Sequence, residues 1–146
     1  TTAERLVRAH LRPEPRIDAG QLLVGHGASA AMDLSDGLAG DLPKILAASN
    51  VSAEIPVDRL PVIAAVRALF PDRWRDLALR GGEDFELLFM FPPERWEAMA
   101  VDAELRGITV TRVGTVTEAS DHPELWLVDP DGSRERLTRG AFDHFR

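Results

Sequence analysis

The sequence predicts an α/β domain with a layered architecture, in which helices pack against a mixed β-sheet. Short apolar runs with the character of buried strands alternate along the chain with longer segments whose apolar residues recur every three or four positions. The second spacing is that of one buried helix face. With 146 residues, of which 45% are hydrophobic, the chain can bury a core, and no internal repeat or long linker divides it. We therefore expect residues 1–146 to form a single domain.

Proline, glycine and asparagine divide the chain into its expected elements, because they end helices and favour turns. In order, the elements expected in the first half are a helix over 1–10, a short helix over 18–24, a strand that ends at 33, a helix from 36 to 49 and a strand over 52–57. Those expected in the second half are a loop and helix over 58–70, a strand over 86–91, a helix over 93–106, strands over 108–116 and 125–128, and a hairpin strand over 135–137.

Two of these helices carry more specific expectations. The helix within 58–70 is expected to face the core with its apolar positions, namely Leu60, Ile63, Val66 and Leu69 or Phe70. Inside the central helix, Pro43 removes a backbone hydrogen-bond donor. We expect it to kink that helix, or to start its regular part after a first turn over 36–42. Asn50 should end the helix, because asparagine tolerates the left-handed conformation.

The stretch over 31–42 holds a dense group of polar side chains at a junction between elements. Asp33 and Asp36 lie where the predicted strand hands over to the predicted helix, and Ser35 lies between them. Two carboxylates with a hydroxyl suit a hard divalent cation such as Mg²⁺, which takes oxygen ligands and bridges to phosphate. The same pattern occurs at ordinary helix starts, where Ser35 or Asp36 caps the free N–H groups of the first turn. The residues alone leave both interpretations open.

A second polar junction lies over 81–84, where two glycines and two acids precede the predicted strand over 86–91. Strand ends are positions at which sheets commonly present ligand-binding groups. The alternative is a tight turn whose acids are solvated. The four histidines are scattered without the spacing of metal ligands, so they do not indicate a catalytic or metal-binding histidine.

Composition excludes several classes of function. The net charge of −7 opposes nonspecific binding to nucleic acid, which depends on basic surface. No run of about eighteen apolar residues would span a bilayer, and no secretory signal is recognisable, so we expect no membrane partner. The absence of cysteine excludes disulfides and thiolate metal sites and agrees with a cytoplasmic location. The chain lacks a G-x-x-x-x-G-K-[ST] phosphate loop, so a kinase activity would belong to a different class of kinase.

Four motifs, in order, resemble those of thiamine-monophosphate kinase, specifically of its C-terminal domain. They are Leu-Arg-Pro-Glu-Pro-Arg over 11–16, Asp-Leu-Ser-Asp-Gly-Leu-Ala-Gly-Asp-Leu over 33–42, Gly-Gly-Glu-Asp-Phe-Glu-Leu-Leu-Phe over 81–89 and Gly-Ala-Phe-Asp-His-Phe over 140–145. The resemblance spans nearly the whole chain. The wider superfamily includes aminoimidazole ribonucleotide synthetase, selenophosphate synthetase and the hydrogenase maturation factor HypE, whose versions of the 33–42 motif are rich in glycine and differently spelled.

The resemblance implies an enzyme that uses ATP and Mg²⁺ to phosphorylate thiamine monophosphate to thiamine diphosphate. Asp33 and Asp36 would bind metal, and Ser35 would contact an ATP phosphate. Glu83 and Phe142 would bind thiamine monophosphate, and no residue is assigned as a catalytic base. Compared with the family pattern, one extra residue precedes Phe142, which leaves open the alternative that this aromatic anchors the end of the chain to the core.

The family also carries an N-terminal domain ahead of the residues that this chain matches. The chain therefore resembles a C-terminal part, which we expect to be inactive without that domain, and the complete enzyme is expected to be a homodimer. Beside Glu83, Asp84 is a weaker candidate for the same contact, and Phe85 is expected to serve in packing. Two alternatives are another ATP-dependent synthetase of the superfamily, such as aminoimidazole ribonucleotide synthetase or selenophosphate synthetase, and a noncatalytic partner domain. The retained acids at both motifs count against the second.

Overall fold

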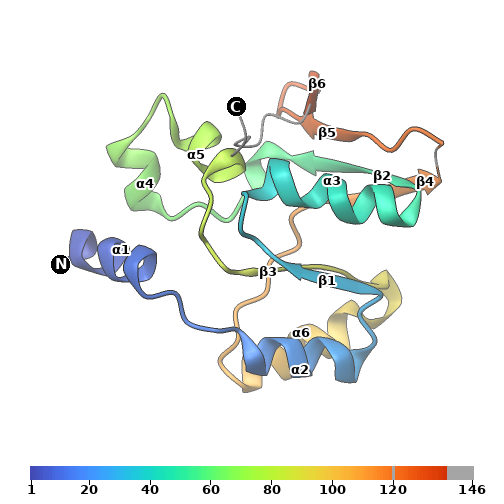
Figure 1. Ribbon diagram of the computed structural model, residues 1–146, viewed down its shortest axis with the longest axis horizontal. Helices are drawn as coiled ribbons and strands as arrows, with labels where there is room; N and C mark the ends of the chain where they lie inside the picture. Colours follow the sequence, from blue (N-terminus) through green and yellow to red (C-terminus); the bar gives the residue numbers. More distant parts are fainter. Residues whose placement is uncertain (120, 138–146) are drawn as a thin grey trace, which may run out of the picture.

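The computed structural model describes residues 1–119 and 121–137, which form helices and strands (Figure 1). The helix over Trp74–Arg80 was not among the expected elements. The helices are α1 (Thr2–Leu11), α2 (Ile17–His26), α3 (Leu38–Ser49), η1 (Val57–Arg59), α4 (Ala64–Leu69), α5 (Trp74–Arg80), η2 (Pro93–Arg95) and α6 (Trp96–Leu105), where η marks a 3₁₀ helix. The strands are β1 (Ala30–Asp33), β2 (Val51–Pro56), β3 (Leu87–Met90), β4 (Thr115–Ala119), β5 (Leu125–Val128) and β6 (Arg134–Leu137). Within the described residues, no helix has the length and apolar character needed to span a bilayer.

The strands form two sheets. The larger sheet has the order β4-β2-β5-β6 and is mixed, because β2 runs parallel to β5 but antiparallel to β4. β5 and β6 form the expected antiparallel hairpin, which turns at Gly132 with a φ of 85°. The smaller sheet is a ribbon in which β1 pairs antiparallel with β3, from Ala30 opposite Met90 to Asp33 opposite Leu87. The mixed sheet with packed helices confirms the α/β fold class.

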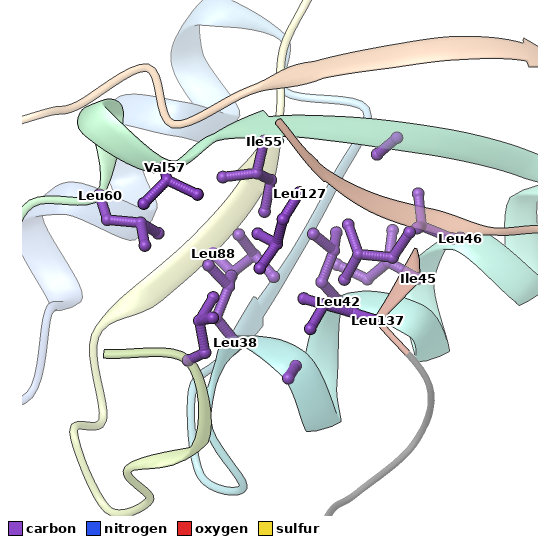
Figure 2. Close-up of a cluster of buried hydrophobic side chains, with 14 residues drawn as sticks. Leu38, Leu42, Ile45, Leu46, Ile55, Val57, Leu60, Leu88, Leu127 and Leu137 are labelled. Atoms are coloured by element: carbon purple, nitrogen blue, oxygen red, sulfur yellow. The ribbon is translucent and has the colours of Figure 1, made fainter. Parts of the chain in front are cut away.

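The main core lies between the larger sheet, α3 and one face of the β1–β3 ribbon (Figure 2). α3 turns one face inward, and its buried apolar side chains recur at helical spacing, as Leu38, Leu42, Ile45 and Leu46. From the sheet, Ile55 and Leu127 are 1% and 0% exposed. Removing a side chain of this size from water stabilises the fold by about 1.5–3 kcal/mol.

β3 is apolar on both faces because it lies between two cores. Successive side chains of a strand point to opposite faces. Leu88 and Met90 accordingly pack in the main core, whereas Phe89 packs against a second core. The second core is formed by buried side chains of α2 and α6, namely Leu22, Met99 and Ala103. The continuous apolar run over 87–91 thus reflects a strand that is covered on both sides, as the sequence predicts.

The structure corrects two expectations about packing and strand length. α4 has no buried residue, and Ile63, Leu69 and Phe70 are exposed, although their spacing predicted an inward face. Leu60, which precedes α4, is buried as predicted and Val66 is half-buried, so the predicted inward face is formed only in part. The strand expected over 108–116 begins only at Thr115, because 108–114 forms no ladder with another strand.

The regular part of the central helix was expected either to be kinked at Pro43 or to start there, and the second expectation is wrong. α3 begins at Leu38 and continues through Pro43 to Ser49, so the regular helix does not start at the proline. Pro43 lacks the N–H group that would bond to the carbonyl of Ala39, one turn earlier. Asn50 ends the helix with a left-handed φ of 52°, as expected.

Candidate functional site

The two motif loops, over 33–37 and 81–86, meet backbone to backbone. β1 and β3 pair immediately before the first loop and after the second, which brings the loops together. The amide of Leu34 donates to the carbonyl of Glu86 at 2.8 Å, and the amide of Phe85 donates to the carbonyl of Leu34 at 2.8 Å. The amide of Glu83 donates to the carbonyl of Ser35 at 2.9 Å. Polar groups that are far apart in the sequence therefore lie at one place in the fold.

This close approach requires glycine at two positions. A Cβ on Gly37 would lie 2.8 Å from the carbonyl oxygen of Gly81, and Gly37 also has a φ of 82°. A Cβ on Gly82 would lie 2.8 Å from the carbonyl oxygen of Ser35. Glu83 and Phe85 have φ values of 65° and 51°, in a region that side chains other than glycine rarely adopt. Strained backbone of this kind clusters at functional sites.

The start of α3 is organised by Asp41 and not by the capping that the sequence suggested. Gly37 occupies the N-cap position, and no side chain caps the helix there, so the expected capping by Ser35 or Asp36 is wrong. The carboxylate of Asp41, which is 0% exposed, instead accepts the amides of both residues, each at 2.8 Å. The backbone over 33–37 folds back over the first turn of α3, and this leaves its amides facing Asp41.

Lys44 compensates the charge of the buried carboxylate. Its ammonium group donates to Oδ1 of Asp41 at 2.6 Å and to Oδ2 of Asp36 at 2.7 Å. Burial raises the pKa of Asp41, but the hydrogen bonds from Lys44 and the two amides outweigh it, so the pKa lies below its ordinary value. The pKa of Lys44 is raised, first by its hydrogen bond with Asp36 and then by that with Asp41. Both groups are therefore charged at neutral pH.

The structure brings the three residues of the first motif to one loop but does not assemble a complete metal site from them. Asp33 ends β1 and is exposed, whereas Ser35 and Asp36 are half-buried in the loop before α3. Among the described residues, no group of three or more acidic or histidine side chains is placed to hold a metal ion. Carboxylate and hydroxyl oxygens are nevertheless the donors that Mg²⁺ prefers. The donor chemistry fits Mg²⁺, and the remaining ligands would have to come from phosphate or from outside the described residues.

Of the two residues expected to bind thiamine monophosphate, the structure describes one. The side chain of Glu83 is 68% exposed, and Phe142 lies outside the described residues. A hollow of about 1150 Å³ has mainly apolar walls and reaches the second loop at Asp84 and Glu86. Its lining does not include Glu83. The candidate site is therefore an open loop surface beside this hollow and not its interior.

The segment over 11–16 reaches the second loop through one ion pair. The guanidinium of Arg16 donates to both carboxylate oxygens of Glu86, at 2.9 and 2.6 Å. Asp84 is exposed, but the surrounding chain removes part of its hydration and raises the pKa of its carboxyl group, and the negative charge of Glu86 acts in the same direction. Phe85 is 40% exposed and has a left-handed φ of 51°, so it is not the buried packing residue that the sequence suggested.

Two pairs of residues at this place escaped the sequence reasoning, namely Asp41 with Lys44 and Arg16 with Glu86. The first pair carried a usable signal, since an acid and a lysine three positions apart share one helix face. Asp41 also stands directly before Leu42, on the side of the helix that the apolar spacing predicted to be buried. The second pair joins residues far apart in the sequence, and a single sequence offers no signal for such a contact.

Residues 2–124, which include both loops, match the family model described as AIR synthase related protein, C-terminal domain. The chain belongs to this family. It is 39% identical to the thiamine-monophosphate kinase of Haemophilus influenzae over 145 residues, which make up 97% of this chain and 43% of that relative. The crystal structure of thiamine-monophosphate kinase from Stenotrophomonas maltophilia K279a is similar with a TM-score of 0.76 and 39% identity, over 89% of this chain and 39% of that one.

A second solved structure, AaThiL complexed with AMPPCP and TMP, is similar with a TM-score of 0.75 and 30% identity. The match covers 97% of this chain and 41% of that one. These similarities confirm the resemblance to thiamine-monophosphate kinase that the motifs indicated, and they confirm the fold. The chain spans less than half the length of the relatives that it matches.

Proposed function

We propose that the complete protein containing this chain transfers the γ-phosphoryl group of ATP to thiamine monophosphate and so forms thiamine diphosphate. The observation that carries the proposal is the meeting of the two motif loops, which three backbone hydrogen bonds join. The chain is similar to thiamine-monophosphate kinases over both loops. A complex with AMPPCP and TMP is known for the similar AaThiL. One loop then serves the nucleotide and the other serves the phosphate acceptor.

The nucleotide side is assigned to the first loop. Asp33 and Asp36 hold Mg²⁺, and Ser35 contacts an ATP phosphate. Because Lys44 engages Oδ2 of Asp36, the oxygen that we assign to the metal is Oδ1. Mg²⁺ held there would supply positive charge that neutralises the phosphates. The net charge of −7 makes such neutralisation necessary before two anionic substrates can approach.

The acceptor side is assigned to the second loop and to Phe142. The exposed carboxylate of Glu83 lies on a residue whose amide is bonded to Ser35, so a substrate that contacts Glu83 is held close to the nucleotide side. The thiazolium ring of thiamine is flat and cationic, and an aromatic face such as that of Phe142 attracts a cation by about 1–2 kcal/mol when both are desolvated. Positioning of the two substrates is the main contribution that these residues make.

The reaction is a direct in-line transfer in which the acceptor is the phosphate of thiamine monophosphate. One of its oxygens attacks the γ-phosphorus while the bond to the β-phosphate oxygen breaks. The attacking oxygen is already anionic at neutral pH, so no general base is needed. The assigned residues accordingly position the substrates and the charges, and none of them acts as a base.

Activity requires the N-terminal domain as well as this chain. The described residues of the chain assemble no complete metal site, and the chain spans about two fifths of the relatives that it matches. We assign the remaining metal and nucleotide ligands to that domain. Residues 1–146 alone are therefore expected to form no thiamine diphosphate, and activity is expected when the domain is joined to them or added in trans.

The test is formation of thiamine diphosphate from ATP, Mg²⁺ and thiamine monophosphate by the protein that includes the N-terminal domain. Asp36→Asn should lower kcat by about a hundredfold or more, because an oxygen donor of the metal loses its charge. Asp102→Asn is the matched control. Asp102 is also a carboxylate in an ion pair, but it lies in α6 and its partners Arg106 and His26 belong to neither loop.

Three results would count against the proposal. Turnover by residues 1–146 alone would contradict the division of ligands between two domains. Full activity of Asp36→Asn would contradict the metal assignment. An intact, folded protein that makes no thiamine diphosphate, but consumes ATP with a different small substrate in a panel, would favour another ATP-dependent synthetase of the superfamily.

A further inference from the structure

We infer that Asp41 is a positioning residue that sets the shape of the nucleotide-facing loop from inside α3. This inference rests on the proposed function, because that function assigns the nucleotide and the metal to Ser35 and Asp36. Asp41 itself touches neither substrate, since its side chain is 0% exposed. Its effect passes through the two residues whose amides it accepts.

The geometry concentrates both contacts on one atom. Oδ2 of Asp41 accepts the amide of Ser35 at 2.8 Å and the amide of Asp36 at 2.8 Å. Two consecutive amides that converge on one oxygen fix the peptide plane between them. The side chains of Ser35 and Asp36 leave the backbone at the two ends of that peptide unit, so their directions depend on how the carboxylate holds it.

The opposite side of the same loop is held by the second motif. The carbonyl of Ser35 accepts the amide of Glu83 at 2.9 Å, whereas the amide of Ser35 is bound to Asp41. Ser35 is thereby clamped between a helix side chain and the loop that carries the proposed acceptor contact. Because Asp41 belongs to a helix with a buried face, the clamp rests on a rigid element. Such support keeps a site close to its productive geometry.

Lys44 permits the carboxylate to be buried in its charged form. Oδ1 of Asp41 accepts from Lys44 at 2.6 Å, so the two oxygens of Asp41 have separate tasks. Among the described residues, no buried side-chain nitrogen or oxygen lacks a hydrogen bond, which includes both oxygens of Asp41. If Oδ1 of Asp36 took a metal ion, Lys44 could stay on Oδ2 of Asp36 and the loop would keep its shape, because Asp41 retains both amides.

The test compares Asp41→Ala with the isosteric Asp41→Asn in the protein that includes the N-terminal domain. Alanine removes both acceptor atoms, whereas asparagine keeps one side-chain oxygen for the amides. Four quantities are measured, namely the hydrogen exchange of the Ser35 and Asp36 amides by NMR, the Kd for AMPPCP with Mg²⁺, the KM for thiamine monophosphate and kcat. Asp102→Asn is the control, because it removes the charge of a paired carboxylate in α6, outside both motif loops.

We expect Asp41→Ala to speed exchange at both amides by tenfold or more, to weaken AMPPCP binding by tenfold or more and to lower kcat, with a smaller change in the KM for thiamine monophosphate. Asp41→Asn should rescue most of the exchange protection and of the nucleotide affinity. The control should change none of these quantities at the loop. If Asp41→Ala does not yield folded protein, the comparison of Asp41→Asn with Asp41→Ser, a shorter acceptor that does not reach both amides, replaces it.

The inference is overturned by a folded Asp41→Ala protein with unchanged exchange at Ser35 and Asp36, or with faster exchange but unchanged nucleotide affinity. It is also overturned if Asp41→Asn loses as much protection as Asp41→Ala. A failure of the proposed function has a different signature, because wild-type protein would then make no thiamine diphosphate. In that case the exchange rates and the Kd still decide the role of Asp41.

Discussion

Replacing Gly37 by alanine is expected to destabilise the protein by about 2–6 kcal/mol, because two separate penalties fall on this residue. With a φ of 82° and a ψ of 164°, its backbone lies in a region that is nearly restricted to glycine, which costs other residues about 1–3 kcal/mol. The new Cβ would also lie 2.8 Å from the carbonyl oxygen of Gly81, and relieving such overpacking costs about 1–3 kcal/mol.

Two other glycines separate these penalties. Gly132→Ala carries only the backbone penalty, since Gly132 has a φ of 85° and nothing lies within 4 Å of the new Cβ. It should cost about 1–2 kcal/mol. Gly82→Ala carries only the steric penalty, since its Cβ would meet the carbonyl oxygen of Ser35 at 2.8 Å without a positive φ. It should cost about 1–3 kcal/mol.

The assay is urea unfolding of the wild type and the three variants, followed by tryptophan fluorescence. The thiamine diphosphate assay is run beside it on the same substitutions in the protein that includes the N-terminal domain. Gly37→Ala should lose about as much free energy of unfolding as the other two variants together. Gly37→Ala and Gly82→Ala should lose activity, because both push the motif loops apart, whereas Gly132→Ala should keep it. The close approach of the loops would be refuted if Gly37→Ala were no less stable than Gly132→Ala and equally active.

Two further predictions concern the main core and the paired carboxylate of Asp102 in α6. Leu127→Ala removes a fully buried side chain from the main core and should lower the free energy of unfolding by about 2–5 kcal/mol in urea titrations. As its control, Val24→Ala at a position that is 82% exposed should change the free energy of unfolding by less than about 0.5 kcal/mol. The pKa of Asp102 is lowered, first by its hydrogen bond from Arg106 and then by that from His26, so the unfolded state binds more protons there and stability falls as pH drops below the ordinary value of 3.8. Thermal melts between pH 2 and 5 should show a shallower loss for Asp102→Asn than for the wild type, and parallel curves would contradict the pairing.

The sequence predicted the parts of the fold that depend on local spacing. The helix α3 and its end at Asn50 followed from apolar periodicity and from the conformational tolerance of asparagine. The apolar run over 87–91 correctly indicated a strand that is buried on both faces. The same reasoning failed in part for α4, which has no buried residue. Leu60 is buried and Val66 is half-buried as the period predicted, but Ile63, Leu69 and Phe70 are exposed.

The candidate site was predictable in its members and less so in its arrangement. The motifs named Asp33, Ser35, Asp36 and Glu83, and the structure brings their loops together, while their roles in binding stay predictions. The capping prediction failed because Gly37 takes the N-cap position and the amides of Ser35 and Asp36 are bound to Asp41. The arrangement of the site also includes the backbone hydrogen bonds between the two loops. A long-range backbone contact leaves no pattern in the spacing of nearby residues.

The pairing of β1 with β3 has a consequence for how the protein acquires its site. The chain between these strands contains α3, β2, η1, α4 and α5, so the ribbon closes a long loop. Closing such a loop costs chain entropy before any contact across it is gained, and folds with many distant contacts form slowly. The two motif loops meet only when that closure occurs. During synthesis, the two motif loops can therefore meet only after Leu87 and its neighbours have left the ribosome.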